Sequence, residues 1–351
     1  MVIDLRSDSS SIPTAEMVQA MCIAAAEPPG FLGREDRYVR RLEAELAERI
    51  GAEDALFCPT CTMANQISVG LHCKPGQAII VQDDAHLVVA EGAAPAALFG
   101  VSFQLARRNP GGSVPERLVP LIATPDGQPA RAALVWLENT HVRSGGTVLD
   151  LPAMKAVHDA ARHQGLPLHL DGSRLFNAAA ALGVEPADLS RLADSVSISM
   201  NKGLAAPLGA ILAGSRAFIR EAEDMRHRLG GAWRSANMAA AAASVALRTM
   251  IERLPEDHAM ARELALELSG LEGLEVDLAQ VQSNIVLVGL DPAIASLPDA
   301  ISQLEEAGIR VSGTGQRLRL VTYYQIRRNE VLRVVAAFKR LLLKPHHNNC
   351  S

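Results

Sequence analysis

The chain has 351 residues, 34 of them basic and 39 acidic, which gives a formal net charge of -5. It has no run of Lys and Arg that would neutralise a nucleic-acid backbone, so we expect no nucleic-acid partner. Its five cysteines are an odd number spread through a long chain, which excludes a small secreted disulfide framework and favours a reducing compartment. No secretion signal or membrane-spanning stretch is recognisable, and we expect a soluble, cytoplasmic protein without a membrane partner.

Short apolar runs alternate with amphipathic stretches over the first two-thirds of the chain. Buried strands are predicted at 55–57, 78–81, 133–139, 166–170, 195–200 and 209–214, and helices at 35–51 and 151–165. This alternation indicates a parallel α/β sheet that helices cover on both faces.

The pattern changes after an alanine-rich helix near 237–253. Strands are predicted at 284–290, 309–313 and 317–323, and helices at 299–307 and from Asn329 onward. We therefore expect a large α/β domain over 1–250, including an N-terminal arm, and a small α+β domain over 251–351.

Two charged residues follow predicted strands that a helical crossover would join. Asp171 follows the strand at 166–170, and Lys202 follows the strand at 195–200. Parallel strands joined in this way end at one edge of the sheet, where open α/β folds bind ligands. A lysine among small apolar residues suits Schiff-base chemistry, and a carboxylate is what the pyridine nitrogen of pyridoxal phosphate needs. The alternatives are a solvated loop lysine and, for Asp171, a helix N-cap.

The segment "FCPTCTMAN", residues 57–65, contains a C-x-x-C pair that could be a redox dithiol, half of a metal site or neither. The pattern predicts a strand and then a helix, so that Cys61 and Thr62 lie at a helix N-terminus, which favours phosphate binding. A redox dithiol would occupy the same position but gives no role to Lys202 and Asp171. A zinc site lacks a second Cys/His pair, so we favour a phosphate cradle and expect no metal.

Six segments resemble, in order, the low-specificity L-threonine aldolases of the aromatic amino acid β-eliminating lyase and threonine aldolase group. They are "IDLRSD" at 3–8, "TMAN" at 62–65, "DAHLVVAEG" at 84–92, "LENTH" at 137–141, "LHLDGSRLFNA" at 168–178 and "NKGLAAPLG" at 201–209. The resemblance extends to "LRLVTYY" near residue 324, and six motifs in one order are specific. It implies fold type I of the pyridoxal-phosphate-dependent enzymes, like aspartate aminotransferase, with pyridoxal 5'-phosphate as cofactor. It also implies an amino-acid substrate and a homodimer or homotetramer.

The resemblance also implies roles for individual residues. The expected cofactor-binding residues are Lys202 as the covalent attachment, Asp171 at the pyridine nitrogen, His86 stacked on the ring, Cys61 and Thr62 at the phosphate, and Arg174. The expected anchors of the substrate carboxylate are Ser7, Arg174 and Arg319. The alternatives are a surface ion pair for Arg174, a cross-strand pair for Arg319 and a capping or core histidine for His86. For "ENTH", a strand end with a packed His141 is an alternative to direct contact with the cofactor.

The sequence departs from the family pattern at four places. Cys61 stands where the family's phosphate loop has a glycine. The family's "DDVYGEDP" segment reads "GFLGREDR", with Phe31 and Arg34 near the places of a tyrosine and acidic residues that line the site across the subunit boundary. A histidine is replaced at about Gln128, and a lysine by His227. These changes leave the cofactor residues in place and concern the substrate.

We therefore expect an aldolase that cleaves a β-hydroxy-α-amino acid to glycine and an aldehyde. The substrate would be like threonine or allo-threonine, or would carry a bulkier or unusual side chain. The catalytic residues would be Lys202, Asp171 and His86, with His86 or a water that it holds as the base. One alternative is a β-eliminating lyase that releases ammonia and a 2-oxo acid, because the replaced histidine weakens the handling of the hydroxyl. Another is an inactive binding protein, against which the joint presence of these residues with Arg174 and Arg319 argues.

Overall fold

The computed structural model describes residues 2–31, 33–107, 114–125, 130–314 and 316–343. The chain forms two compact units: Ile12–His141 with Val148–Ile251, and Met1–Ser11 with Val142–Thr147 and Glu252–Ser351. The N-terminal arm joins the smaller unit because β1 (Ile3–Asp4) pairs in parallel with β11 (Ile309–Arg310). The sequence pattern groups this arm with a large domain over 1–250. That division of the chain into domains stays a prediction.

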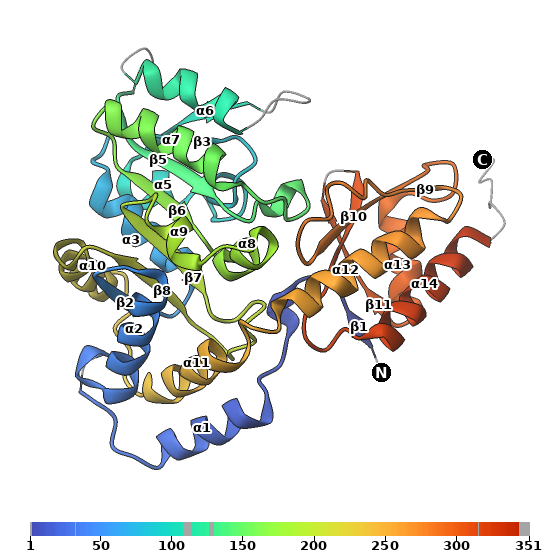
Figure 1. Ribbon diagram of the computed structural model, residues 1–351, viewed down its shortest axis with the longest axis horizontal. Helices are drawn as coiled ribbons and strands as arrows, with labels where there is room; N and C mark the ends of the chain where they lie inside the picture. The colour runs from blue at the N-terminus through green and yellow to red at the C-terminus, as the bar shows by residue number, and fades with distance from the viewer. Residues whose placement is uncertain (1, 32, 108–113, 126–129, 315, 344–351) are drawn as a thin grey trace. The chain divides into compact units, whose positions relative to one another are not determined.

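A seven-stranded sheet forms the centre of the larger unit (Figure 1). Its strands, in spatial order, are β2 (Asp54–Cys58), β8 (Ala210–Gly214), β7 (Ser195–Ser199), β6 (Leu168–Asp171), β5 (Ala132–Glu138), β3 (Ala78–Gln82) and β4 (Ser102–Ala106). Six strands share one direction, whereas β8 is antiparallel to both of its neighbours. The sequence pattern predicted a parallel sheet, but the connection at 200–209 is too short for the crossover that a parallel neighbour would need.

Helices cover both faces of this sheet, as the alternating pattern predicted. They are α1 (Ala15–Ala25), α2 (Arg37–Ile50), α3 (Cys61–His72), α4 (His86–Val89), α5 (Ala94–Phe99), α6 (Val114–Ala123), α7 (Leu151–His163), α8 (Leu175–Leu182), α9 (Pro186–Ser190), α10 (Arg216–Arg228) and α11 (Asn237–Thr249). Helix α3 contacts α5 and α10 on one face, whereas α7 contacts α6 and α9 on the other. Helix α1 packs along α11 (Figure 1).

Helix α3 presents two different surfaces to the sheet. Ala64 and Ile67 pack into an apolar cluster with residues of β2, β8 and α10. Asn65 and Ser68, which are also buried, hydrogen-bond instead to side chains of β6 and β7. Because residues three and four apart lie on one side of a helix, α3 carries a continuous polar stripe from its N-terminus to its C-terminus. This stripe reaches the carboxyl edge of the sheet.

The smaller unit is built on an antiparallel sheet. Its strands, in spatial order, are β12 (Ser312–Thr314), β13 (Arg317–Val321), β10 (Ile285–Leu290) and β9 (Leu274–Glu275), and its helices are α12 (Leu254–Ser269), α13 (Leu297–Glu306) and α14 (Arg328–Leu343). Its core joins Val286 and Val288 of β10 to Phe338 of α14. Across the described part of both units, each helix is too short or too polar to span a membrane.

Candidate active site

Two neighbouring strands bring Asp171 and Lys202 to one edge of the large sheet. Strands β6 and β7 pair in parallel, with Asp171 opposite Ser197, and helices α8 and α9 form the crossover between them. Asp171 is the last residue of β6, and Lys202 lies in the connection that follows β7. Both therefore lie beyond the carboxyl ends of parallel strands, as their spacing predicted. The N-cap of α8 is Arg174, so Asp171 does not cap that helix.

Asp171 is held as a buried, hydrogen-bonded carboxylate. It is 1% exposed, and its Oδ2 accepts a hydrogen bond of 2.9 Å from Nδ2 of Asn65. Its Oδ1 accepts from the backbone N–H and the hydroxyl of Ser173, at 3.1 and 2.7 Å. Burial alone would raise the pKa of Asp171, but the positive charges of Lys202 and His86 lower it below its ordinary value. An ionised carboxylate is the form that pairs with a protonated pyridine nitrogen.

His86 begins helix α4, close to Asp171. Its backbone N–H donates to Oε2 of Glu138 at 2.6 Å, and its Nδ1 lies 2.9 Å from Oε1 of Glu91. The hydrogen bond with Glu91 raises the pKa of His86, against the effect of burial, and the charge of Asp171 raises it further. The N-cap of α4 is Ala85, and the His86 side chain is 35% exposed. His86 is therefore neither a capping nor a core histidine.

The start of helix α3 lies next to Asp171. Thr60 is the N-cap, and Cys61 and Thr62 are the first two helical residues. The Cys61 sulfur lies 3.1 Å from the hydroxyl of Ser173, which in turn donates to Asp171. Because the first N–H groups of a helix have no partner within it, Cys61 and Thr62 present donors that suit a phosphate.

The C-x-x-C pair lacks the properties expected of a redox dithiol. Cys58 and Cys61 are both free thiols, and Cys58 is fully buried in β2. Burial raises the pKa of each thiol to about 12. A dithiol that exchanges with disulfides needs a thiolate near neutral pH, which neither residue provides.

The polar groups at this edge also resemble a metal site. His86, Glu91 and Asp171 offer ligand atoms within 4.8 Å of one another. Amide groups already hydrogen-bond both carboxyl groups, and the positive charge of Lys202 acts on Asp171. A cation would have to compete with these groups, so we interpret the three residues as a hydrogen-bonded network.

Arg174 and the "ENTH" segment also lie in the larger unit. Arg174 is 7% exposed, which is inconsistent with a surface ion pair. Nδ2 of Asn139 donates to the carbonyl of Leu149 at 2.8 Å, and Oδ1 of Asn139 accepts from the N–H of Leu149 at 3.1 Å. Nε2 of His141 lies 3.5 Å from Oδ1 of Asp84. The segment therefore braces the loop that carries His86.

Ser7 and Arg319 lie in the smaller unit. Arg319 donates a 3.0 Å hydrogen bond to the carbonyl of Arg6, the residue before Ser7. The residues directly opposite Arg319 in the sheet are Leu287 and Ser312, neither of which is charged, so no ion pair forms with a facing residue. The structure thus brings two of the three expected carboxylate anchors close together.

The altered segment "GFLGREDR" is anchored within the larger unit. Arg34 forms ion pairs of 2.9 Å with Glu43 and 2.6 Å with Asp54. Phe31 is 60% exposed, and the guanidinium of Arg234 lies 4.3 Å from the centre of its ring. Arg34 is therefore a structural residue in this unit.

The remaining two positions that depart from the family pattern are Gln128 and His227. Gln128 lies outside the described residues. His227 is exposed in the last turn of α10.

The motifs do not single out several buried or half-buried polar residues that organise this site. They are Asn65, Glu91, Glu138, Ser173 and Ser197. Four of them lie inside the six quoted segments, and Ser197 lies on β7. Their positions were therefore visible in the sequence, whereas their contacts were not.

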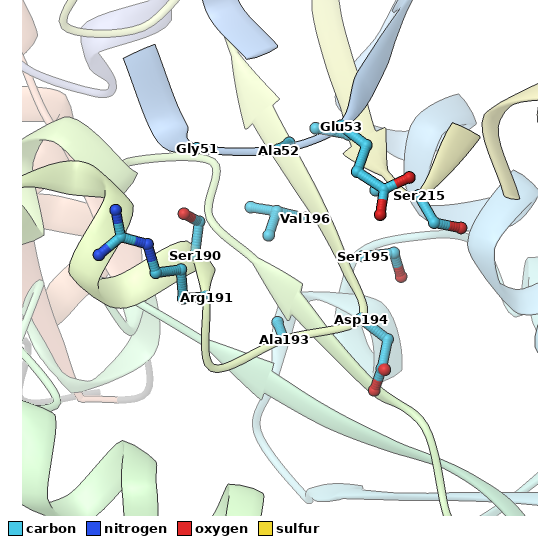
Figure 2. A pocket seen from close by; sticks show the side chains of 12 residues that line it. Gly51, Ala52, Glu53, Ser190, Arg191, Ala193, Asp194, Ser195, Val196 and Ser215 are labelled. Carbon is cyan, nitrogen blue, oxygen red and sulfur yellow. The ribbon is translucent and has the colours of Figure 1, made fainter. Parts of the chain in front are cut away.

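A hollow of about 160 Å³ lies at the opposite, amino edge of β7 (Figure 2). Its acidic side chains bond nearby backbone groups: Glu53 accepts from the N–H of Arg216, and Asp194 from that of Leu168. These groups support the local fold, so the carboxyl edge remains the candidate site.

Comparison with known proteins identifies the family of the chain. Residues 4–290 match the β-eliminating lyase family. The chain is 37% identical to low-specificity L-threonine aldolase 1 of Arabidopsis thaliana, over 97% of this chain and 96% of the plant protein. It is 33% identical to the low-specificity L-threonine aldolase of Escherichia coli K12, over 98% and 100% of the two chains. The structure of a Leishmania major threonine aldolase shares the fold, with a TM-score of 0.83 and 19% identity over 97% and 99% of the chains. Fold type I is thus confirmed.

Proposed function

The chain belongs to the β-eliminating lyase family and, within it, to the low-specificity L-threonine aldolases, and we propose that it cleaves a β-hydroxy-α-amino acid to glycine and an aldehyde. The cofactor of this reaction is pyridoxal 5'-phosphate, which withdraws electrons from the Cα–Cβ bond when it is bound. The family expected from the six motifs is confirmed. Because the sequence departs from the family pattern at four places, the proposal includes substrates whose side chain differs from that of threonine.

The observation that carries the proposal is the buried carboxylate of Asp171 beside Lys202 at the carboxyl edge. Its 1% exposure and its hydrogen bonds to Asn65 and Ser173 hold it in one orientation. A buried anion in this position is stabilised by a positive ring nitrogen. We assign Lys202 as the covalent attachment, and the N–H groups of Cys61 and Thr62 as the phosphate-binding groups.

Our assignments for the substrate rest on side-chain chemistry. His86 would stack on the cofactor ring when the cofactor is bound, and it would take the proton of the β-hydroxyl, directly or through a water, for which an imidazole is suited. Ser7, Arg174 and Arg319 are our candidates for holding the carboxylate, because guanidinium groups bind carboxylates through paired hydrogen bonds.

We further propose a cytoplasmic homodimer or homotetramer without a nucleic-acid partner. Val18 and Ile23 of α1 are 47% and 53% exposed, and Phe31 is 60% exposed. Exposed apolar side chains within one segment of the chain, residues 18–31, support an interface with another copy of the chain. Sedimentation equilibrium of the purified protein tests this part, and a monomer at micromolar concentration would contradict it.

The decisive experiment is to incubate the cofactor-loaded protein with threonine, allo-threonine, phenylserine and β-hydroxyaspartate, and to follow products by proton NMR. We expect glycine with the matching aldehyde, in a rank order that defines the preferred side chain, and no glycine from the Lys202→Ala variant. Ammonia and a 2-oxo acid in place of glycine would support β-elimination. Cofactor binding without any product would support a binding protein.

A further inference from the structure

Glu91 occupies an unusual position in the loop between α4 and α5. Its side chain is fully buried and faces three nitrogen atoms. Oε1 accepts a 2.7 Å hydrogen bond from Nδ2 of Asn65 and lies 2.9 Å from Nδ1 of His86, while Oε2 accepts a 2.7 Å bond from Nε2 of Gln66. Amide N–H groups only donate, so both oxygens act as acceptors, as in an ionised carboxylate.

This arrangement determines which nitrogen of His86 carries the proton. An ionised carboxylate can only accept, so Nδ1 of His86 must be the donor. In the neutral imidazole, Nε2 is then the atom without a proton, and it is the one that can accept from a substrate.

We propose that Glu91 is a positioning residue for the reaction, because it holds His86 in the tautomer in which Nε2 accepts the substrate proton. This inference rests on the proposed role of His86 as the base. Glu91 makes no assigned contact with substrate or cofactor and acts through the imidazole.

The charges around His86 agree with this role. Glu91 from the α4–α5 loop, Glu138 from β5, Asp171 from β6 and Lys202 from the β7–β8 connection face it. Glu91 bonds the ring directly, whereas Glu138 bonds the backbone N–H. The hydrogen bond with Glu91 is the largest contribution to the raised pKa of His86, and Lys202 opposes it.

Asn65 fixes Glu91 relative to Asp171. Its Nδ2 donates to both carboxylates, at 2.7 and 2.9 Å, and its Oδ1 accepts a 2.6 Å hydrogen bond from the Ser197 hydroxyl. Because all these atoms have partners, the amide is held in one orientation. The carboxylate expected to face the ring nitrogen and the one that orients His86 are thus connected through one side chain.

The Glu91→Gln substitution removes the charge and keeps the shape. Its carbonyl oxygen can still accept from Asn65 and His86, while its new amide group faces Gln66. The Oε1 atom of Gln66 is buried without a hydrogen-bond partner in the described part of the chain, so a rotation of this amide would supply the acceptor. We therefore expect the variant to fold. Gln66→Met is the matched control, because it removes one bond to Glu91 and keeps the charge.

The test is the titration of His86 by long-range ¹H–¹⁵N NMR in protein labelled on histidine nitrogen, assigned by difference from a His86→Asn variant. In the wild type we expect protonated Nδ1, bare Nε2 and a midpoint above the ordinary value of about 6.5. In Glu91→Gln the midpoint should fall by about one to three units, and the acid limb of kcat/KM should move with it. Gln66→Met should leave both unchanged.

Three results would overturn the inference: a proton on Nε2 instead of Nδ1 of His86 in the neutral wild type, an unchanged midpoint in Glu91→Gln, or a pH profile of kcat/KM that does not follow the NMR midpoint. An equal shift in Gln66→Met would also overturn it, because the effect would then come from packing. Failure of the proposed function is a separate result, namely no glycine from the wild type, and the NMR titration does not depend on it.

Discussion

His86 and His169 lie in the same unit, yet their surroundings give them opposite properties. His86 is bonded to the carboxylate of Glu91, and its pKa is raised. His169 is fully buried, its Nδ1 lies 2.8 Å from the hydroxyls of Ser68 and Ser195, and burial lowers its pKa to about 3. Hydroxyls offset little of the cost of burying a charge, whereas a carboxylate offsets much of it.

The polar stripe of α3 connects these two regions. Its first half, with Cys61 and Asn65, contacts the residues around Asp171. Its second half, with Ser68 and His72, contacts Ser195, and burial lowers the pKa of His72 to about 4. We therefore assign the first half of the stripe to the proposed active site and the second half to packing.

The strongest test of the first half is Asp171→Asn, which keeps the shape and removes the charge. We expect kcat/KM for glycine release to fall by about 10²–10³-fold, with the fold retained, because the electrostatic partner of the cofactor is lost. Steady-state kinetics and circular dichroism check this. A loss below tenfold would mean that the charge of Asp171 is not needed.

Lowering the pH should reduce the free energy of unfolding through the buried histidines at the second half of the α3 stripe. A buried histidine with a lowered pKa takes up its proton on unfolding, so its contribution is complete above pH of about 6.5 and is lost as the pH falls toward the folded value. For His169 this loss is about 3 kcal/mol at pH 4.5. Urea unfolding of wild type and His169→Gln between pH 7 and 4.5 isolates it, because the carboxyl groups are common to both. Parallel curves would contradict the prediction.

The contribution of the His86–Glu91 pair to stability should depend on pH in the opposite direction. Its contribution is complete below pH of about 6.5 and is lost as the pH rises through the raised pKa of His86. The same pH series on Glu91→Gln supplies this half of the comparison.

Ser195→Ala should separate packing from chemistry. The Ser195 hydroxyl contacts Nε2 of His72 and Nδ1 of His169, so its removal takes a partner from His72, leaves His169 with Ser68, and costs about 1–3 kcal/mol. We expect kcat/KM per folded molecule to stay within about twofold of the wild type, because these residues do not touch the site. A tenfold loss of kcat/KM would instead place the second half of α3 in the active site.

The smallest expected effect is a gain in stability from the substitution Ala205→Gly. Ala205 lies in the connection after Lys202 with φ of +58°, a conformation that is unfavourable for residues with a Cβ. Glycine should raise the free energy of unfolding by up to about 1 kcal/mol. Ala206→Gly is the control, since Ala206 has no positive φ, and it should destabilise. Equal effects in thermal unfolding would exclude relief of strain.

Local sequence predicted the elements that end in functional residues. The strands before Asp171 and Lys202 and the helix that starts at Cys61 form where the apolar patterns placed them. The alternating exposure of strand β4 is typical of a half-buried strand, but the predicted strands were continuous apolar runs, which β4 does not form. The direction of β8 was not predicted because an apolar run carries no direction.

The network around His86 could not be predicted from local sequence. Asn65 and Glu91 are 26 residues apart, and nothing in either segment indicates that the other will bury it. Arg34 shows the reverse case. Its position in the sequence matches family residues that line the active site, whereas its ion pairs with Glu43 and Asp54 give it a structural role. The contacts of Ser7 and Arg319 with substrate stay a prediction.

The antiparallel direction of β8 has an entropic consequence for Lys202. Its connection is closed by the paired residues Ser199 and Ala210, and backbone bonds from Ala205 to Lys202 and from Ala206 to Met200, at 2.8 and 3.0 Å, cross it. A segment with these constraints has few conformations to lose when a ligand arrives, so little of the binding free energy is spent on ordering it. The lysine backbone is therefore organised before the cofactor binds.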